Sequence, residues 1–234
     1  MKTIVAASER EPLFLTTHWS LVVSAADDSA ASLETLCQQY WQPIYAVARK
    51  QGHDIEAAKD LTQSFFGKLL EKGWLESADE SKGRFRTFLV TALKRYLINE
   101  WHRENTIKRG RGIHFSEFDT VAAERLAPCE RDLSPERLFD RRWALTLLDI
   151  ALARLKEESG DDFELLKDSL TAGRGEIDYA ALAQSLATTE GAARVAVHRL
   201  RKQYRAVIRA EIAQTCATDS EVDDELRILM EALI

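Results

Sequence analysis

The sequence predicts an all-α protein with two helical domains, a linker between them and an amphipathic helix at the C-terminal end. Three observations support this fold class. Apolar residues recur at the three- and four-residue spacing of a helix along most of the chain. A helix-start signature, Ser134-Pro135-Glu136, opens the second half, and glycines such as Gly52 and Gly73 end periodic stretches.

The first domain is expected at residues 30–107, after a leader at 1–29. A helical pattern runs from Ala31 to Gln51, where Pro43 must kink or divide the helix. A second helix is expected from Asp54 to Lys72. The stretch from Gly83 to Arg103 is a third, and it interleaves basic residues with aromatic rings. Basic side chains follow a nucleic-acid backbone while rings stack on unpaired bases, although packing in the core is the competing interpretation.

Residues 108–133 lose the helical periodicity and are interpreted as a linker. The second domain is expected at 134–210, with a long helix to about Glu158 and a short one from Asp161 to Ala172. We have no sequence-based account of why the segment 157–178 is present. Residues 211–234 form an acidic tail with its own apolar stripe, which predicts a helix that packs on the second domain. The alternative is a tail that also lies near the basic helix and competes with DNA.

Residues 178–209 predict a helix-turn-helix. The break falls at Ala187-Thr188-Thr189, and a threonine can cap the second helix. That second helix is two-faced: one side is apolar, from Ala193 to Ile208, and the other is basic. Residues 192–209 contain six Lys/Arg and no Asp or Glu. An apolar stripe that seats the helix and a basic stripe for the major groove are what this motif requires. An amphipathic surface helix with solvated arginines is the alternative.

Charge is distributed in islands. Residues 82–111 carry nine Lys/Arg and two Asp/Glu, whereas the whole chain has a net charge of −6. Acidic flanks repel the phosphates that the basic islands attract. The pattern predicts a protein that reads DNA when a partner delivers it, and that binds free DNA poorly.

Other classes of protein fit the sequence less well. The three cysteines, Cys37, Cys129 and Cys216, lack the spacing of a zinc site or a disulfide framework, so no metal and no cofactor are expected. No apolar run reaches the length of a membrane span, and a secretion signal is absent, so we expect a cytoplasmic protein without membrane contact. Scattered histidines and the lack of a nucleophile–base set argue against an enzyme.

Three segments, in this order, resemble the sigma-70 family of bacterial RNA polymerase sigma factors, and most closely its two-domain extracytoplasmic-function group. DLTQSFF (Asp60–Phe66) is similar to the family's DLxQExF, with Ser64 in place of the glutamate. FRTFLVTALKRYLINEWHR (Phe85–Arg103) is similar to FRxWLxxIARNxxxDxxRR. EGAARVAVHRLRKQYR (Glu190–Arg205) is similar to EGTVKSRLHRARxxLR, with Ala192-Ala193 in place of threonine-valine.

The resemblance implies a region 2-like bundle, a region 4-like helix-turn-helix domain and three sets of functional residues. Those implied to contact core polymerase are Asp60, Gln63, Phe65 and Phe66. Those implied along the melted −10 strand are Arg86, Lys94, Arg95, Asn99, Trp101 and Arg103. Those implied at the −35 element are Arg194 and His198 on base edges, with Arg199, Arg201 and Lys202 on phosphates.

The expected partners are therefore the core of bacterial RNA polymerase and promoter DNA, and the sequence leaves open whether an anti-sigma factor exists. A stand-alone helix-turn-helix regulator is the competing function. It would account for residues 178–209, but it leaves the first basic island without a role and requires self-association to read a palindrome.

Overall fold

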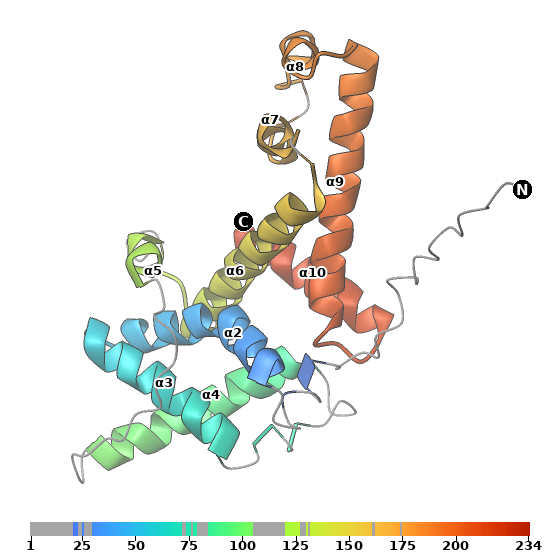
Figure 1. The fold of residues 1–234 in the computed structure, drawn as a ribbon. Coiled ribbons are helices and arrows are strands. Elements are labelled where there is room, and N and C mark those ends of the chain that lie inside the picture. Colours follow the sequence, from blue (N-terminus) through green and yellow to red (C-terminus); the bar gives the residue numbers. More distant parts are fainter. Residues whose placement is uncertain are drawn as a thin grey trace, which may run out of the picture.

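The computed structural model describes residues 21–22, 25, 30–71, 74–75, 77–78, 84–104, 120–126, 130, 132–160, 162–173 and 175–234. Within these ranges every regular element is a helix, which confirms the predicted all-α fold. All but a few residues of the predicted leader lie outside the described residues. Figure 1 shows the helices of the first half forming one end of the molecule, while α9 (Glu190–Ala213) projects away from them.

Three helices form the bundle in the first half: α2 (Ala30–Lys50), α3 (Ile55–Glu71) and α4 (Phe85–Glu104). α2 continues through Pro43 as one helix, so the proline does not divide it. Aromatic rings join the bundle: Tyr40 meets Phe85 edge to face at 5.6 Å, and Phe65 meets Tyr96 at 5.4 Å between ring centroids. Edge-to-face pairs of this kind add to the stabilisation that burial provides.

The long helix α6 (Pro135–Glu158) joins this bundle to the C-terminal half. Ser134 caps it by accepting a hydrogen bond from the Arg137 amide at 3.3 Å, as the sequence signature predicts. Its first half places Phe139, Trp143 and Leu147 in the same apolar cluster as α2, α3 and α4. The two halves of the chain therefore share one hydrophobic core.

Part of the predicted linker also packs against this core. Helix α5 (Thr120–Leu126) buries Ala123, and Glu124 accepts hydrogen bonds from Arg49 Nε and the Tyr45 hydroxyl, both at 2.7 Å. Farther along, the buried Glu130 pairs with the buried Arg142, with 2.7 Å between Oε2 and Nη2. These contacts fasten the described part of the segment to α2 and α6.

The predicted helix-turn-helix is present as α8 (Tyr179–Ser185) and α9. Asp178 caps α8, and Thr189 caps α9 by accepting from the Ala192 amide at 3.2 Å. Between them Ala187 has a φ of 49°, the left-handed conformation. The Thr188 amide donates to the Ala183 carbonyl and the Ala187 amide to the Gln184 carbonyl, which is the bonding pattern of a Schellman turn.

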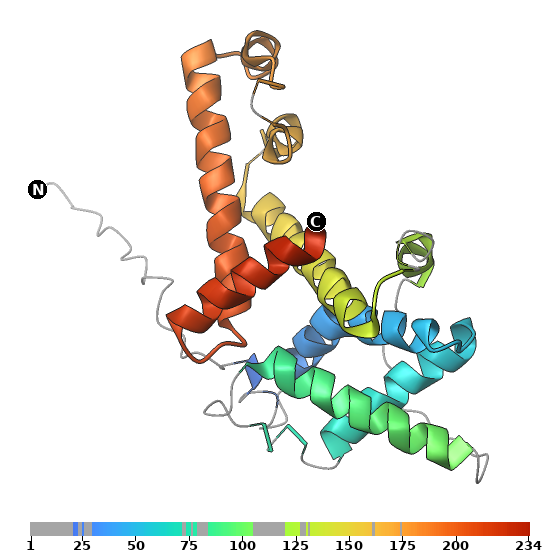
Figure 2. The same cartoon turned by 180° about the vertical axis from the view of Figure 1, so that it is seen from behind.

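The segment without a sequence-based account builds the support for this motif. It contains α7 (Phe163–Leu166) and the 3₁₀ helix η3 (Lys167–Leu170). Phe163 and Leu166 form a second, smaller apolar cluster with Leu155 of α6 and with Val197 and Leu200 of α9. Figure 2 shows α7 and α8 beside the outer part of α9, away from the first bundle.

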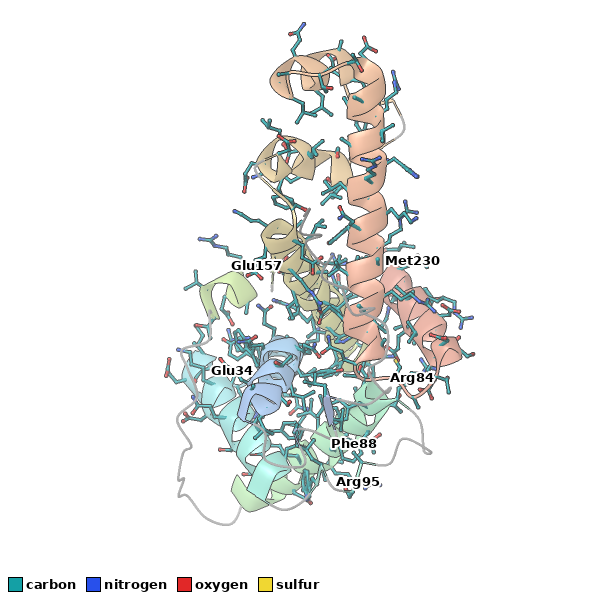
Figure 3. The ribbon with its side chains drawn as sticks, turned by 45° about the vertical axis from the view of Figure 1, so that its right-hand side comes forward. Glu34, Arg84, Phe88, Arg95, Glu157 and Met230 are labelled. Atoms are coloured by element: carbon teal, nitrogen blue, oxygen red, sulfur yellow. The ribbon has the colours of Figure 1, made fainter. Side chains whose placement is uncertain are left out.

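The acidic tail is the helix α10 (Asp219–Leu233), and it packs against the base of α9 and against α6. Val222 and Leu229 enter the large core together with Val207 and Ile212 of α9. This outcome matches the packing alternative for the tail. The structure adds a contact that the sequence did not indicate, because α10 also reaches the beginning of α4, near Arg84 in Figure 3.

Candidate nucleic-acid interface

The outer part of α9 presents a basic face that the other described residues leave exposed. Arg194, His198, Arg199 and Lys202 are all exposed there. Their apolar counterparts Ala193, Val197 and Leu200 are buried on the opposite side, as the two-faced pattern predicts. The helix begins at a capped N-terminus and projects from the body, so this face can enter a DNA groove.

Arg194 is held in place and yet remains available. Its guanidinium lies 4.1 Å from the centroid of the Tyr179 ring, and Glu190 one turn earlier is 3.8 Å away. The side chain is still 58% exposed. A cation stacked on a tyrosine loses some of its rotamers, which favours one direction for the Arg194 guanidinium.

Arg201 does not take the phosphate-binding role that the resemblance implies. Its Nε and Nη2 donate to the Ser169 carbonyl at 2.9 and 2.6 Å, and Nη2 also donates to the Ala172 carbonyl at 2.6 Å. Ser169 lies in the last turn of η3, and Ala172 follows it. Arg201 thus ties the supporting segment to α9, since carbonyls at the end of a short helix lack partners within it.

The second basic face lies along α4. Lys94, Arg95 and Asn99 are exposed on one side of the helix, and Figure 3 shows Arg95 farther along α4 than Arg84 and Phe88. Lys94 pairs with Glu136 at the start of α6 at 2.9 Å, and both side chains are about half exposed. An exposed pair of this kind contributes little and opens readily for a phosphate. The side chains of Trp101 and Arg103 lie outside the described residues, although both belong to α4.

Arg86 was expected on the −10 strand, and the structure places it elsewhere. Its side chain is 11% exposed, and its Nε donates to Glu225 of α10 at 2.8 Å. It also pairs with Asp140 of α6 and lies over the Trp143 ring, 5.2 Å from the centroid. A guanidinium so enclosed joins α4, α6 and α10 and is not offered to DNA. Burial raises the pKa of the Asp140 carboxyl, which Arg86 partly offsets.

The four residues of α3 that were expected to contact core polymerase divide into an accessible pair and a buried pair. Asp60 is exposed and Gln63 is half-buried, which leaves both accessible to a partner. Phe65 and Phe66 are 0% and 2% exposed, so the expectation that they form part of the contact surface is wrong for this structure. They belong to the core, where Phe65 packs on Tyr96 of α4. Their role is to hold α3 so that Asp60 and Gln63 face outward.

The network around Glu225 is the feature that sequence reasoning missed. Glu225 is 2% exposed and pairs with Arg84 at 3.0 Å as well as with Arg86. One signal was present in the sequence, because Glu225 falls three residues after Val222 and four before Leu229, on the apolar side of its helix. An acid at such a position needs a buried cation as its partner.

The described part of the chain offers neither a metal site nor a membrane span. There, no three His, Cys, Asp or Glu side chains gather as a metal site would require. No helix among the described residues has both the length and the apolar character needed to cross a bilayer. Cys37 and Cys216 are buried, and burial raises the pKa of each thiol to about 12.

Comparison with known proteins gives one match. Residues 36–106 match the family model for Sigma-70 region 2, a range that contains α3, α4 and most of α2. Neither the curated proteins nor the solved structures contain a match to this chain. The matched range includes the exposed residues of α3 and α4, and this part of the chain is similar to region 2 of sigma-70 RNA polymerase sigma factors.

Proposed function

We propose that the protein is a promoter-specificity subunit of bacterial RNA polymerase, of the two-domain extracytoplasmic-function type, with no catalytic chemistry of its own. The observation that carries this proposal is the pair of exposed basic faces. One lies on α4 inside the region 2 match, and the other lies on α9 of a helix-turn-helix. A protein that contacts two separate promoter elements requires two such faces.

In this proposal each surface has one task. Asp60 and Gln63 on α3 bind the core polymerase. Lys94, Arg95 and Asn99, continued by Trp101 and Arg103, follow the melted −10 strand. Arg194 and His198 read base edges of the −35 element, while Arg199 and Lys202 contact phosphates. Unstacking a base costs a few kcal/mol, which stacking and backbone contacts along α4 must offset.

The decisive experiment combines the purified protein with core bacterial RNA polymerase on a promoter library. Transcripts that begin at a defined subset of sequences, and only when the protein is present, are the expected result. Tight and sequence-selective DNA binding without core polymerase would instead favour the stand-alone regulator. The absence of both results would refute the proposed function.

Two sets of variants assign the surfaces. Asp60→Ala with Gln63→Ala should weaken binding to core polymerase in a competition assay. The matched control, Asp132→Ala with Gln184→Ala, removes the same two residue types from exposed positions away from α3. Arg194→Ala should cost about 1–3 kcal/mol and relax preference at one base pair, whereas Lys202→Ala should weaken all sequences alike. Equal losses on every promoter variant for both substitutions would show that the −35 contacts are misassigned.

A further inference from the structure

Val195 is a large apolar side chain exposed on the basic side of α9. It is 47% exposed, and it lies three residues before His198 and four before Arg199, so the three side chains share one face of the helix. Neither apolar cluster of the described residues includes it. The apolar contacts that seat α9 come from the other side, through Ala193, Val197 and Leu200.

The stability of α9 gives no reason for a valine at this place. A β-branched side chain loses rotamer freedom in a helix, and an exposed position provides little burial in return. Alanine, which occupies the neighbouring positions 192, 193 and 196, would suit the helix better. Since neither apolar cluster of the described residues takes up these methyl groups, a bound partner offers a way to bury them.

The geometry of the first turns lets a DNA groove approach Val195 closely. Gly191, one turn before it, meets no side chain other than Thr189 Oγ1 at 4.0 Å when a Cβ is added, and the exposed Ala192 is also small. Recognition helices contact base edges through their N-terminal residues. In the major groove the apolar group that a base edge presents is the C5 methyl of thymine.

We propose that Val195 reads the C5 methyl group of a thymine in the −35 element and so helps to set the promoter preference. This inference rests on the proposed function, because it requires α9 to enter the major groove. It adds an apolar contact to a face on which Arg194 and His198 supply the polar ones.

The test isolates the methyl group on the DNA. Promoters are first selected from duplexes with a randomised −35 window, transcribed by core polymerase together with the full-length protein. Each thymine of the enriched element is then replaced singly by deoxyuridine, which keeps the base pair and removes only the methyl. For the wild-type protein, binding of the polymerase complex should fall about fourfold at one position, as expected for one buried methyl group.

Protein variants connect that loss to Val195. Val195→Ala should bind the thymine duplex about fourfold less tightly and should no longer distinguish thymine from deoxyuridine at that position. Val195→Ile should keep the discrimination. The control is Leu165→Ala in α7, since Leu165 is also 47% exposed but lies off α9, and this variant should behave as the wild type does. Far-ultraviolet circular dichroism should show unchanged helicity for all three variants.

The outcomes separate this inference from the function on which it rests. If selective transcription occurs but the element lacks thymine, or the wild type tolerates deoxyuridine everywhere, the inference fails and the proposed function stands. A Val195→Ala variant that keeps the wild-type sensitivity to deoxyuridine also overturns it. If no element is enriched from the library, the proposed function itself fails.

Discussion

Ala187 occupies a left-handed backbone conformation, with a φ of 49°, that residues other than glycine and asparagine rarely adopt. The Schellman turn around it requires this conformation, because only then do the amides of Ala187 and Thr188 reach back to α8. The angle between α8 and α9 thus depends on Ala187, whose backbone conformation is strained.

Replacing Ala187 by glycine should relieve that strain. We expect Ala187→Gly to raise the free energy of unfolding by about 0.5–1 kcal/mol, the relief of the left-handed penalty less the greater entropy of an unfolded glycine. Denaturant titration followed by circular dichroism measures the change. Ala181→Gly, an exposed site inside α8, is the control and should destabilise by about 1 kcal/mol. A loss of stability in Ala187→Gly would contradict this account of the turn.

At the scale of single elements, α10 is held by a buried carboxylate as well as by its apolar stripe. Glu225→Ala leaves Arg86 enclosed without its main partner. Breaking such a pair costs up to about 3–5 kcal/mol, because the Arg86 charge stays buried and keeps only Asp140 as its acidic partner. Chemical denaturation at pH 7 should show a loss of this size. The control Glu231→Ala removes an exposed acid from the same helix and should change little. A loss below 1 kcal/mol for Glu225→Ala would mean that water reaches Arg86.

The docking of α5 should depend on pH through Glu124. The hydrogen bond from Arg49 is the largest cause of a pKa below the ordinary 4.5 for this carboxyl. Because the pKa of the Glu124 carboxyl is lower in the folded state, its ionised form stabilises the fold above pH 4.5. That contribution is lost as the pH falls through the pKa of the folded state. The wild type should therefore exceed Glu124→Gln in unfolding free energy by the largest amount at pH 7. This difference should shrink toward zero as the pH falls below 4.5.

Urea titrations of both proteins at pH 7, 5, 4 and 3 measure this difference. Glu157→Gln, which removes an exposed carboxylate from α6, serves as the reference for general effects of lost charge. A gap between wild type and Glu124→Gln that widens as the solution becomes more acidic would refute the assigned role of the Arg49 pair.

At the scale of the whole molecule, the two apolar clusters differ in size and should open separately. The large core joins α2, α3, α4, α6, α9 and α10, whereas five buried residues from α6, α7 and α9 make the small one. Regions with fewer buried contacts open at lower free energy. Hydrogen exchange measured by mass spectrometry should therefore be faster in α7 and α8 than in α2.

A pair of cavity-forming variants tests this division. Phe139→Ala removes a ring that is 1% exposed in the large core, and should speed exchange in α2 and α10 together. Leu155→Ala acts in the small cluster and should speed exchange mainly in α7 and α8. Equal acceleration of all helices by both substitutions would show that the molecule opens as a single unit.

The sequence predicts the helices other than α5 well, because their ends have local causes that can be read from the residues. Ser134-Pro135 opens α6, Thr189 opens α9 and Ala187 marks the turn between α8 and α9. The site was predicted less completely, because exposure depends on contacts between distant segments. Phe65 and Phe66 resemble a contact motif, yet they pack in the bundle. Arg86 meets Glu225, a residue 139 positions away, and no local pattern shows that pairing.

The length of α9 has a consequence for how this chain can change over evolution. Its outer part sits in the small cluster through Val197 and Leu200, and its base sits in the large core through Val207 and Ile212. A single residue inserted between Leu200 and Val207 would turn the outer face by about 100° against the base and lengthen the helix by about 1.5 Å. Arg194 would then take the direction that the buried Ala193 has now, and Val195 would take the direction that Arg194 has now. Substitutions along α9 change one side chain at a time, whereas insertions and deletions there would change which side of the outer helix is exposed.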